Sequence, residues 1–279
     1  MSKKKKTFNW ARLLAASLNG LVKIAPGLTG KIAFTLFCTP LRKRKKPAET
    51  AFLKTGRWST TTLNNRKYAL YEWGNSGPVA LFFHGWESHS GRWRKLVPLY
   101  LKAGYRVIAA DGPAHGRSSG SRFTMIEYAR MMESLIREHQ PEIVVGHSVG
   151  ASSLIWAMGS LETTFLPQKA VLLCPFSQLS YTLNKTARAL GIAPAVMDAM
   201  QVRLQAFAAL RLEDIDLAKK ASNLQTVQGL LIHDKEDKVT AYTESERIHA
   251  AWPNSQLILT EGNGHGLTAP KTLLLMVNF

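Results

Sequence analysis

Short runs of apolar residues alternate with amphipathic stretches along most of this chain, from about residue 58 onward. The apolar runs that predict strands cover residues 67–73, 79–86, 105–111, 142–148, 170–174, 229–233 and 256–260. Helices are expected over 124–139, over 149–160 and from about 270. Apolar strands separated by helices are typical of a parallel sheet that is covered on both faces. The pattern therefore predicts an α/β fold with a mostly parallel central sheet and helices on both of its sides.

One stretch of the chain departs from this alternation. Between about residues 176 and 225 the sequence is helical in pattern throughout, with a break at Pro194. An all-helical insertion in a strand–helix series predicts a cap over the carboxyl ends of the strands. Functional groups collect just beyond those ends in parallel sheets, and here the predicted strands end in polar or glycine-rich segments.

The first 57 residues differ from the rest in charge. They contain 14 lysines and arginines and a single acid, Glu49, whereas the other 222 residues carry 22 basic and 18 acidic side chains. Helical spacing places six apolar residues of this segment on one face: Trp10, Leu13, Leu14, Leu18, Leu21 and Val22. We therefore divide the chain into a basic amphipathic extension, residues 1–57, and an α/β domain, residues 58–279, that includes the cap.

The basic extension has two interpretations. Lysines 3–6 and the basic cluster at 42–46 flank its helix, so residues 1–46 could bind an anionic membrane surface as a peripheral protein on the inner face of the membrane. The same helix could instead pack on the α/β domain with its lysines in solvent. Nucleic acid is not expected as a partner, because no aromatic–basic stacking pattern or reader motif accompanies the charge.

The lack of a clear secretory signal and the context of the two cysteines favour a cytoplasmic protein. The apolar stretches near the start are shorter than the roughly 20 residues that a membrane-spanning helix needs. A secretory signal is disfavoured because Asn19, Gly20 and Lys23 interrupt the apolar segment. The two cysteines, Cys38 and Cys174, lie in unrelated contexts and offer no disulfide framework, which fits a reducing compartment.

The sequence Gly146-His147-Ser148-Val149-Gly150 stands between a predicted strand and a predicted helix. Ser148 could simply cap the helix, but G-x-S-x-G in this context is typical of a strained turn that exposes a nucleophilic serine. A serine nucleophile needs a base within hydrogen-bond reach, and the base needs an acid to orient it. Downstream strands supply the acids Asp234, Glu236 and Asp237, and then His265 between two glycines.

Together these segments resemble the α/β-hydrolase fold superfamily, in particular the bacterial serine hydrolases that include esterases and serine aminopeptidases. The pieces are FFHGW, DGPAHGRS, GHSVG, LIHDKEDKV and GHG, in this order over about residues 66–279. The resemblance implies Ser148 as nucleophile, His265 as general base and Asp237 as orienting acid. Asp237 is implied because the family's acid stands four residues after a strand-end histidine, here His233. Some relatives carry the acid after the sixth strand, where this chain has CPFSQ and no carboxylate.

The same comparison suggests how an oxyanion and a substrate would be held. The backbone N–H of Val149 follows the nucleophile at a helix N-terminus, and a second N–H is expected from Trp86 in the loop after FFHG. The Trp86 indole would then form a wall of the substrate pocket. Further candidates for the lining are Phe176, Met197, Met200 and Phe207. The last three stand at helical spacing, which favours packing as the alternative.

The predicted activity is hydrolysis of a carboxylic ester through an acyl-enzyme on Ser148, with an uncharged or acyl-chain small molecule as substrate. No cofactor is needed, and no metal is expected because His84, Glu87 and His89 match no standard zinc spacing. Thioester hydrolysis, amide hydrolysis and acyl transfer on the same residues stay open. A second class is a binding protein without catalysis that acts through the basic N-terminus. The sequence leaves the oligomeric state open.

Overall fold

The computed structural model describes residues 10–41, 46–208 and 210–279, without the side chains of 207 and 208. The lysines at 3–6, most of the cluster at 42–46 and the side chain of Phe207 therefore lie outside the described residues. The chain forms two compact units. One contains Met1–Cys38 and Leu179–Ile215, and the other contains Thr39–Gln178 and Asp216–Phe279.

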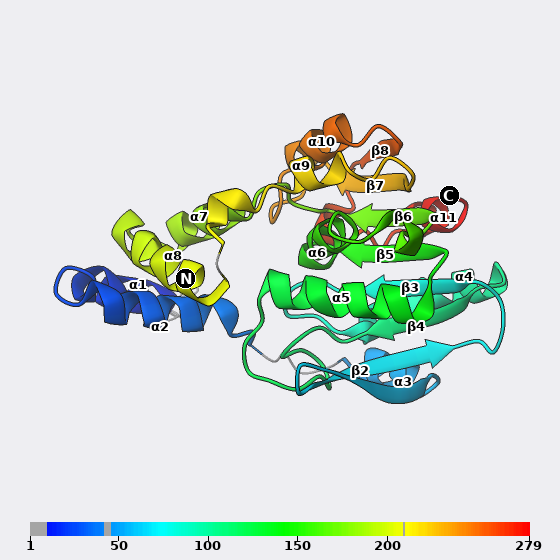
Figure 1. Cartoon of the computed structure of the whole chain (residues 1–279), viewed down its shortest axis with the longest axis horizontal. Helices are drawn as coiled ribbons and strands as arrows, with labels where there is room; N and C mark the ends of the chain where they lie inside the picture. Colours follow the sequence, from blue (N-terminus) through cyan, green and yellow to red (C-terminus); the bar gives the residue numbers. More distant parts are fainter. Residues whose placement is uncertain (1–9, 42–45, 209) are drawn as a thin grey trace, which may run out of the picture. The chain divides into compact units, whose positions relative to one another are not determined.

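An eight-stranded sheet organises the larger unit (Figure 1). Its strands are β1 (Arg57–Leu63), β2 (Arg66–Trp73), β3 (Val79–Phe83), β4 (Arg106–Ala110), β5 (Ile143–His147), β6 (Lys169–Leu173), β7 (Gln228–Asp234) and β8 (Ser255–Thr260). They are arranged in the order β1-β2-β4-β3-β5-β6-β7-β8. The strand β2 runs antiparallel to both of its neighbours, and all later strands are parallel. The predicted mostly parallel sheet is confirmed.

Helices cover both faces of this sheet (Figure 1). One face carries α5 (Met125–His139), α6 (Val149–Met158), α9 (Leu217–Ala221) and α10 (Tyr242–Ala251). The other carries α3 (Pro47–Leu53), the short helix η1 (Ser90–Lys95), α4 (Val97–Lys102) and α11 (Pro270–Val277). Because side chains alternate along a strand, neighbouring residues of β3 serve opposite faces. Phe83 contacts Tyr128 of α5, whereas Phe82 points to the face of α4.

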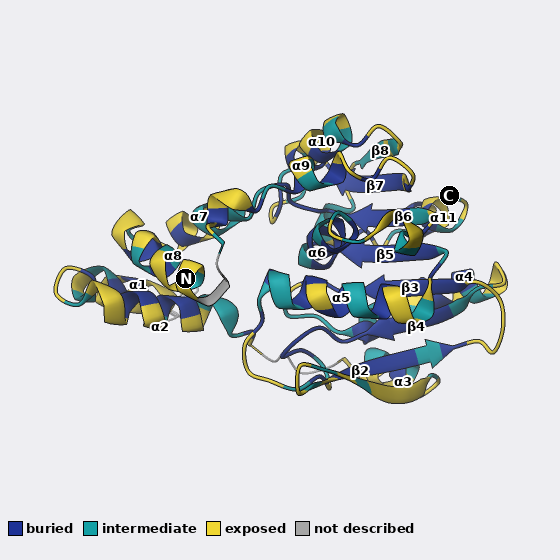
Figure 2. Ribbon diagram, viewed as in Figure 1, coloured by how far each residue is buried: buried dark blue, intermediate teal, exposed yellow. Residues whose placement is uncertain are grey.

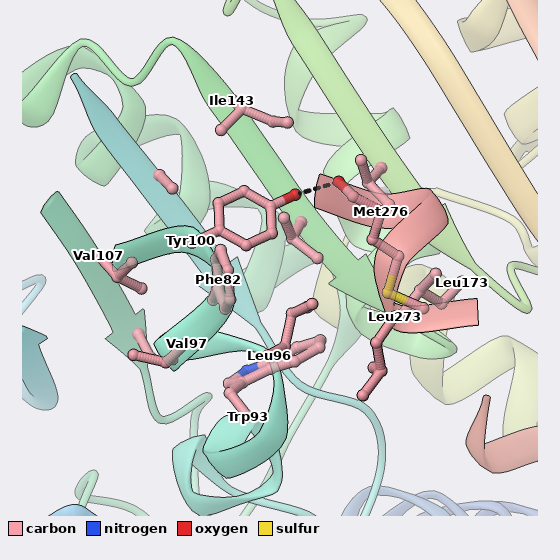
Figure 3. Close-up of a cluster of buried hydrophobic side chains, with 14 of the residues drawn as sticks. Phe82, Trp93, Leu96, Val97, Tyr100, Val107, Ile143, Leu173, Leu273 and Met276 are labelled. Atoms are coloured by element: carbon pink, nitrogen blue, oxygen red, sulfur yellow. Dashed lines mark hydrogen bonds between the residues drawn. The ribbon is translucent and has the colours of Figure 1, made fainter. Parts of the chain in front are cut away.

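Aromatic residues fill the core on the α4 side (Figure 3). The ring of Phe82 packs edge to face against Trp93 at 5.2 Å and against Tyr100 at 5.0 Å between centroids. The Tyr100 hydroxyl donates a hydrogen bond of 2.7 Å to the backbone oxygen of Met276 in α11. The phenol thus buries its ring and satisfies its polar end, as buried tyrosines normally do.

The strand β1, which forms a hairpin with the predicted strand β2, is an element that the apolar pattern missed. The two strands join through Asn64 and Asn65, whose φ angles of 50° and 61° suit a tight two-residue turn. The strand β1 lies at the edge of the sheet and is largely exposed. Its sequence RWSTTTL is therefore polar, and it lacks the apolar run by which a buried strand is recognised.

The smaller unit combines the N-terminal helices with the helical insertion. It consists of α1 (Trp10–Leu21), α2 (Pro26–Cys38), α7 (Leu179–Leu190), α8 (Pro194–Ala208) and the short helix η3 (Leu212–Asp214). Figure 2 shows buried and exposed residues on α1, α2, α7 and α8. Their shared core contains Ala15, Leu18, Val22, Ala33, Phe34, Ala187, Ile192, Val196, Met197, Met200 and Leu212. Among the described residues, no helix is long and apolar enough to cross a membrane.

Two residues show why residues 10–38 belong with the insertion. The Asn19 side chain donates to the Gly191 oxygen at 2.9 Å and accepts from the Ala193 N–H at 2.8 Å. It thereby ties α1 to the turn between α7 and α8. Gly30 of α2 faces the backbone of Ala199 in α8, where an added Cβ would lie 2.2 Å from the carbonyl oxygen. The absence of a side chain at Gly30 lets the two helices approach closely.

The division at residue 57 therefore needs correction. The structure joins residues 46–57 to the sheet, because Phe52 stacks on Trp73 at 4.7 Å and Leu53 lies in the core of that unit. Glu49 of α3 forms ion pairs with His89 at 3.4 Å and with Arg94 at 3.5 Å. The charge change along the sequence marked a boundary in composition, whereas these contacts place the structural boundary near residue 38.

Candidate active site

Ser148 stands in a strained turn between β5 and α6. Its φ of 54° and ψ of −126° are a conformation that residues with a side chain rarely adopt, at a cost of about 1–3 kcal/mol. The Ser148 N–H donates to the Leu173 oxygen of β6 at 2.7 Å and so extends the sheet to the last residue before the helix. Strain of this kind persists only where the surroundings enforce it, and it concentrates at functional sites.

Close backbone packing brings the loop after β3 to the turn at Ser148. A Cβ on Gly150 would lie 2.3 Å from the His84 oxygen, and a Cβ on Gly85 would lie 3.1 Å from the Ser148 Cβ. Both contacts are possible only because these positions lack side chains. The chain segment that leads into Trp86 therefore runs beside Ser148, as the sequence motif implied.

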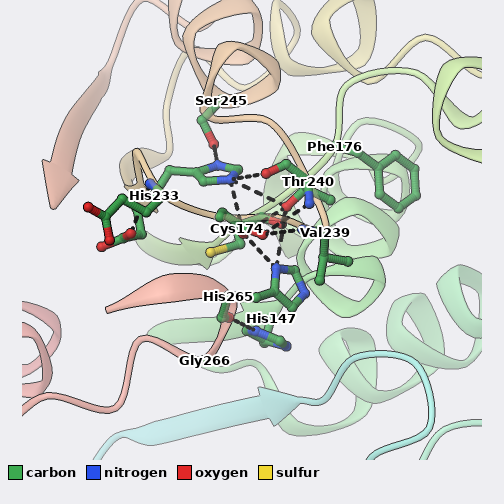
Figure 4. Close-up of polar contacts among 12 residues, drawn as sticks. His147, Cys174, Phe176, His233, Val239, Thr240, Ser245, His265 and Gly266 are labelled. Carbon is green, nitrogen blue, oxygen red and sulfur yellow. Dashed lines mark hydrogen bonds and ion pairs between the residues drawn. The ribbon is translucent and has the colours of Figure 1, made fainter. Parts of the chain in front are cut away.

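A histidine and a carboxylate meet in the loops that follow β8 and β7, and Figure 4 shows the histidine, His265, beside Thr240 and His147. His265 lies in the short helix η4 (Gly264–Gly266), and its Nδ1 is 2.6 Å from Oδ2 of Asp237. Because a carboxylate only accepts, Nδ1 carries the proton and Nε2 is left as the basic atom. The Asp237 side chain is fully buried, whereas that of His265 is 22% exposed. This pair has the geometry of a base with its orienting acid.

Several donors converge on the Asp237 carboxylate. Its Oδ1 accepts the backbone N–H groups of Val239 at 2.7 Å and Thr240 at 3.1 Å. Its Oδ2 also accepts the Thr240 hydroxyl at 3.1 Å, and His233 Nε2 lies 3.3 Å away. Burial by itself would raise the pKa of Asp237, but the hydrogen bonds from His233 and His265 hold it well below its usual range. The group is therefore a carboxylate at neutral pH.

The two other acids of this segment serve elsewhere. Asp234 accepts the Thr260 hydroxyl and the Asn263 N–H, each at 2.8 Å, so it joins the loops that follow β7 and β8. Burial by itself would raise the pKa of Asp234, but these hydrogen bonds outweigh it and lower the pKa. Glu236 is exposed at the surface. Of the three acids, Asp237 is thus the one that contacts His265.

His147 and Arg92 connect the histidine loop to the turn at Ser148. Nε2 of His147 lies 2.8 Å from the backbone oxygen of His265, so it carries a proton and donates it. Nδ1 is then the acceptor for the Arg92 guanidinium, which also donates to the Gly266 oxygen at 3.3 Å. The His147 and His265 rings contact each other with centroids 4.8 Å apart. The sequence predicted no role for Arg92, since no motif marks a residue 174 positions away from its partner.

The loop after β3 is held by buried polar residues. His84 donates from Nδ1 to the Gly85 oxygen at 2.7 Å and accepts the Gly112 N–H at Nε2 at 2.9 Å. Asp111 accepts the N–H and hydroxyl of Ser90 at 2.8 and 2.7 Å. Burial lowers the pKa of His84 well below its usual value, so the ring is neutral. These residues brace the loop and leave no free basic nitrogen on His84.

The residues predicted for the oxyanion hole and the substrate pocket lie in different parts of the structure. Val149 begins α6, so its N–H has no carbonyl partner within the helix. The Trp86 indole is 39% exposed and packs edge-on against His115 and Phe123. Phe176 is buried, with its backbone bonded to the Ser152 hydroxyl. Met197 and Met200 lie in the core of the helical unit, which is the packing alternative, and the Phe207 side chain lies outside the described residues.

One group of metal-binding residue types occurs among the described residues. Donor atoms of Cys174, His233 and Asp237 lie within 4.8 Å of one another. Burial raises the pKa of the Cys174 thiol far above its usual range, so the sulfur is protonated. Both Asp237 oxygens already accept hydrogen bonds from the protein. A protonated thiol and an occupied carboxylate suit a metal ion poorly.

The buried histidine His84 predicts a loss of stability in mild acid. Its folded-state pKa lies below the unfolded value of about 6.5, so the unfolded chain binds more protons as the pH falls through 6.5. The free energy of unfolding should then decrease by about 1.4 kcal/mol per pH unit from this group. Urea unfolding at several pH values, for wild type and His84→Gln, measures this. Glutamine keeps one donor and one acceptor, and equal slopes for the two proteins would contradict the prediction.

Comparison with known proteins agrees with the fold of the sheet. The Alpha/beta hydrolase family matches residues 80–271, and the chain belongs to this family. It is 33% identical over 90 residues to a bifunctional esterase/perhydrolase of Acinetobacter calcoaceticus, which covers 30% of this chain and 33% of that protein. It is 31% identical over 91 residues to a monoacylglycerol lipase of Mycolicibacterium smegmatis, covering 29% and 32%. The matches thus span about a third of these relatives.

Solved structures resemble the chain over a larger part of its length. An esterase from Pyrococcus furiosus has a TM-score of 0.62 at 20% identity and covers 86% of this chain and 93% of its own. A thioesterase domain from the curacin biosynthetic pathway has a TM-score of 0.59 at 17% identity and covers 80% and 99%. At these identities the likeness shows the fold, and the chemistry has to be argued from the residues.

Proposed function

We propose that this protein is a serine hydrolase that cleaves a carboxylic ester through an acyl-enzyme on Ser148. The observation that carries the proposal is the 2.6 Å contact between His265 and the buried Asp237, in the loops that follow the parallel strands. It leaves Nε2 of His265 as a base, and the His147 ring holds that loop next to Ser148. An oriented base beside a strained serine supports acyl transfer chemistry.

The proposed reaction proceeds in two halves. Ser148 Oγ attacks the ester carbonyl carbon while Nε2 of His265 takes the hydroxyl proton, and Asp237 stabilises the imidazolium that forms. The N–H groups of Trp86 and Val149 hold the oxyanion, and its collapse expels the alcohol, which receives the proton from His265. A water molecule then attacks the acyl group after losing its proton to the same nitrogen. The carboxylic acid departs and Ser148 regains its proton.

The substrate is proposed to be a small uncharged ester whose acyl group lies beside Trp86. Trp86 is 39% exposed and directly follows Gly85, which packs against Ser148. An esterase/perhydrolase and a lipase among the relatives make an ester the first choice. A panel of p-nitrophenyl esters and acyl thioesters of increasing chain length would distinguish ester from thioester preference.

Labelling with a fluorophosphonate probe tests the proposal directly, because the probe reacts covalently with activated serines. We expect labelling of the wild type, none of Ser148→Ala, and normal labelling of Ser160→Ala. Ser160 is exposed just beyond α6 and serves as the matched serine control. A folded wild type that neither reacts with the probe nor hydrolyses any ester or thioester of the panel would refute the proposal.

Arg92 is expected to act as a positioning residue for His265. Burial lowers its pKa to about 10, so it stays charged at neutral pH and can donate to His147 and Gly266. Arg92→Met should lower kcat about 10²-fold with little change in KM, because the loop that carries His265 loses its hydrogen bond at Gly266 and the ring of His147 loses its donor. Steady-state kinetics measures this, with partial recovery expected in Arg92→Lys.

The control for this experiment is Arg94→Met. Arg94 lies in the same short helix, but its side chain pairs with Glu49 of α3 and not with His147 or Gly266. Its replacement should leave both kinetic constants within a few-fold of wild type, as is usual for exposed ion pairs. Equal losses in Arg92→Met and Arg94→Met would show that the short helix, rather than the bond to His147, matters.

A further inference from the structure

Exposed apolar side chains are concentrated on α1, α2 and the turn between them. Fifteen large apolar residues are exposed among the described residues, and six of them lie between residues 10 and 38. We call these six the N-terminal apolar surface: Trp10 (72% exposed), Leu13 (49%), Leu14 (44%), Ile24 (85%), Leu28 (53%) and Leu36 (41%). Single exposed apolar residues are ordinary, but a concentration in one short segment marks an interaction site.

Both helices carry two separate apolar sides. Ala15 and Leu18 of α1, and Val22 just after it, face the core of the helical unit, whereas Leu13 and Leu14 are exposed. The single apolar face expected from the sequence is thus divided between two surroundings. In α2, Ala33 and Phe34 are buried while Leu28 and Leu36, two helical turns apart, are exposed. One apolar side is enough for packing in the unit, so the second is available for a partner.

The charge around this surface indicates which partner. Residues 1–57 contain 14 basic side chains and only one acid, and neither α1 nor α2 contains an acidic residue. Lys23 and Lys31 are exposed within the same segment, and lysines 3–6 and the basic cluster 42–46 flank it in the sequence. A partner that fits must therefore offer both an apolar layer and a high density of negative charge.

An anionic lipid bilayer meets both requirements. Amphipathic helices bind such membranes with apolar side chains at the level of the acyl chains and with lysines at the headgroups. A second copy of this chain would bring two strongly basic surfaces together, which like-charge repulsion disfavours. Nucleic acid would use the charge and leave the apolar side chains in water.

We propose that the α1–α2 segment attaches this protein to the surface of an anionic phospholipid membrane through the N-terminal apolar surface and the surrounding lysines and arginines. The attachment is peripheral, with the helices lying in the interface. It is independent of the proposed hydrolysis, since none of its residues belongs to the candidate active site.

Co-sedimentation of the full-length protein with sucrose-loaded vesicles tests the proposal without using activity. The vesicles contain either phosphatidylcholine alone or equal parts of phosphatidylcholine and phosphatidylglycerol. We expect binding to the anionic vesicles, and at least about tenfold weaker partitioning to the neutral ones or in high salt. The variant Leu13→Gln/Ile24→Gln/Leu28→Gln should also bind about tenfold or more weakly, because it removes apolar side chains that enter the interface.

The matched control is Val202→Gln/Leu274→Gln, which replaces exposed apolar residues outside the N-terminal apolar surface. It should bind anionic vesicles like the wild type. Absence of wild-type binding to anionic vesicles, or equal binding by the triple variant, would overturn the proposal. So would light scattering that shows a dimer in wild type and a monomer in the triple variant, because a second copy would then cover this surface.

Discussion

Replacement of Ser148 by alanine is expected to lower kcat for a soluble ester about 10⁶-fold, which leaves only the contribution of substrate binding and of the oxyanion donors. The reason is chemical: Oγ is the atom proposed to attack the carbonyl carbon, and alanine has no nucleophile there. Initial rates with p-nitrophenyl butyrate, measured on purified and folded protein, give the comparison. Retention of more than about a hundredth of the wild-type kcat would contradict the nucleophile assignment.

The same position allows an independent test of strain. At φ 54° and ψ −126°, a side chain at residue 148 is unfavourable, whereas glycine adopts this conformation readily. Ser148→Gly should therefore unfold with a free energy about 1 kcal/mol higher than Ser148→Ala, although both lack the hydroxyl. Chemical denaturation of the two variants measures the difference. Equal stabilities would mean that the turn relaxes without its side chain.

Replacement of Asp237 by asparagine is expected to lower kcat about 10⁴-fold while the fold is retained. The amide is neutral and so stabilises the imidazolium less, and it can donate to Nδ1 of His265 and thereby select the wrong tautomer. The substitution acts on the 2.6 Å hydrogen bond between His265 Nδ1 and the fully buried carboxylate of Asp237. The measurement is kcat with a soluble ester, together with a thermal unfolding curve.

Two neighbouring acids serve as controls for this substitution. Glu236→Gln removes an exposed charge one position away and should leave kcat within a few-fold of wild type. Asp234→Asn should lower stability, because Asp234 accepts hydrogen bonds from Thr260 and Asn263. If Glu236→Gln lost as much activity as Asp237→Asn, the general negative charge of the segment would be responsible and not the contact to His265.

The N-terminal segment shows where the sequence pattern was insufficient. The spacing of Leu18 and Val22 predicted an amphipathic helix, and a helix is present over Trp10–Leu21. An apolar stripe does not identify its partner, however, and the partner lies more than 160 residues further along the chain. Asn19 interrupts the apolar pattern, yet its amide joins α1 to the turn at Gly191 and Ala193. That contact depends on two segments that meet only in the folded chain.

The candidate active site shows the same distinction at the level of single residues. The motif around Ser148 was recognisable because a tight strand-to-helix turn requires glycines next to the serine. The selection of Asp237 over Asp234 and Glu236 rested on resemblance. In the structure, Asp237 is the one of the three acids that forms a hydrogen bond with His265, at 2.6 Å. Arg92 had no signal of its own in the sequence, because its contacts to His147 and Gly266 span 55 and 174 residues.

The amino-acid sequence by itself therefore determined the strands of the parallel sheet, the helices between them and the serine turn. These features arise from local periodicity, from apolar runs long enough to be buried and from glycines at fixed spacing. Only the tertiary structure decided the order of the strands, the packing of α1 and α2 with α7 and α8, and the network of Arg92, His147 and His265. Such contacts depend on which distant segments pack together. Packing requires surfaces that are complementary in shape and polarity, and a local sequence pattern does not contain that information.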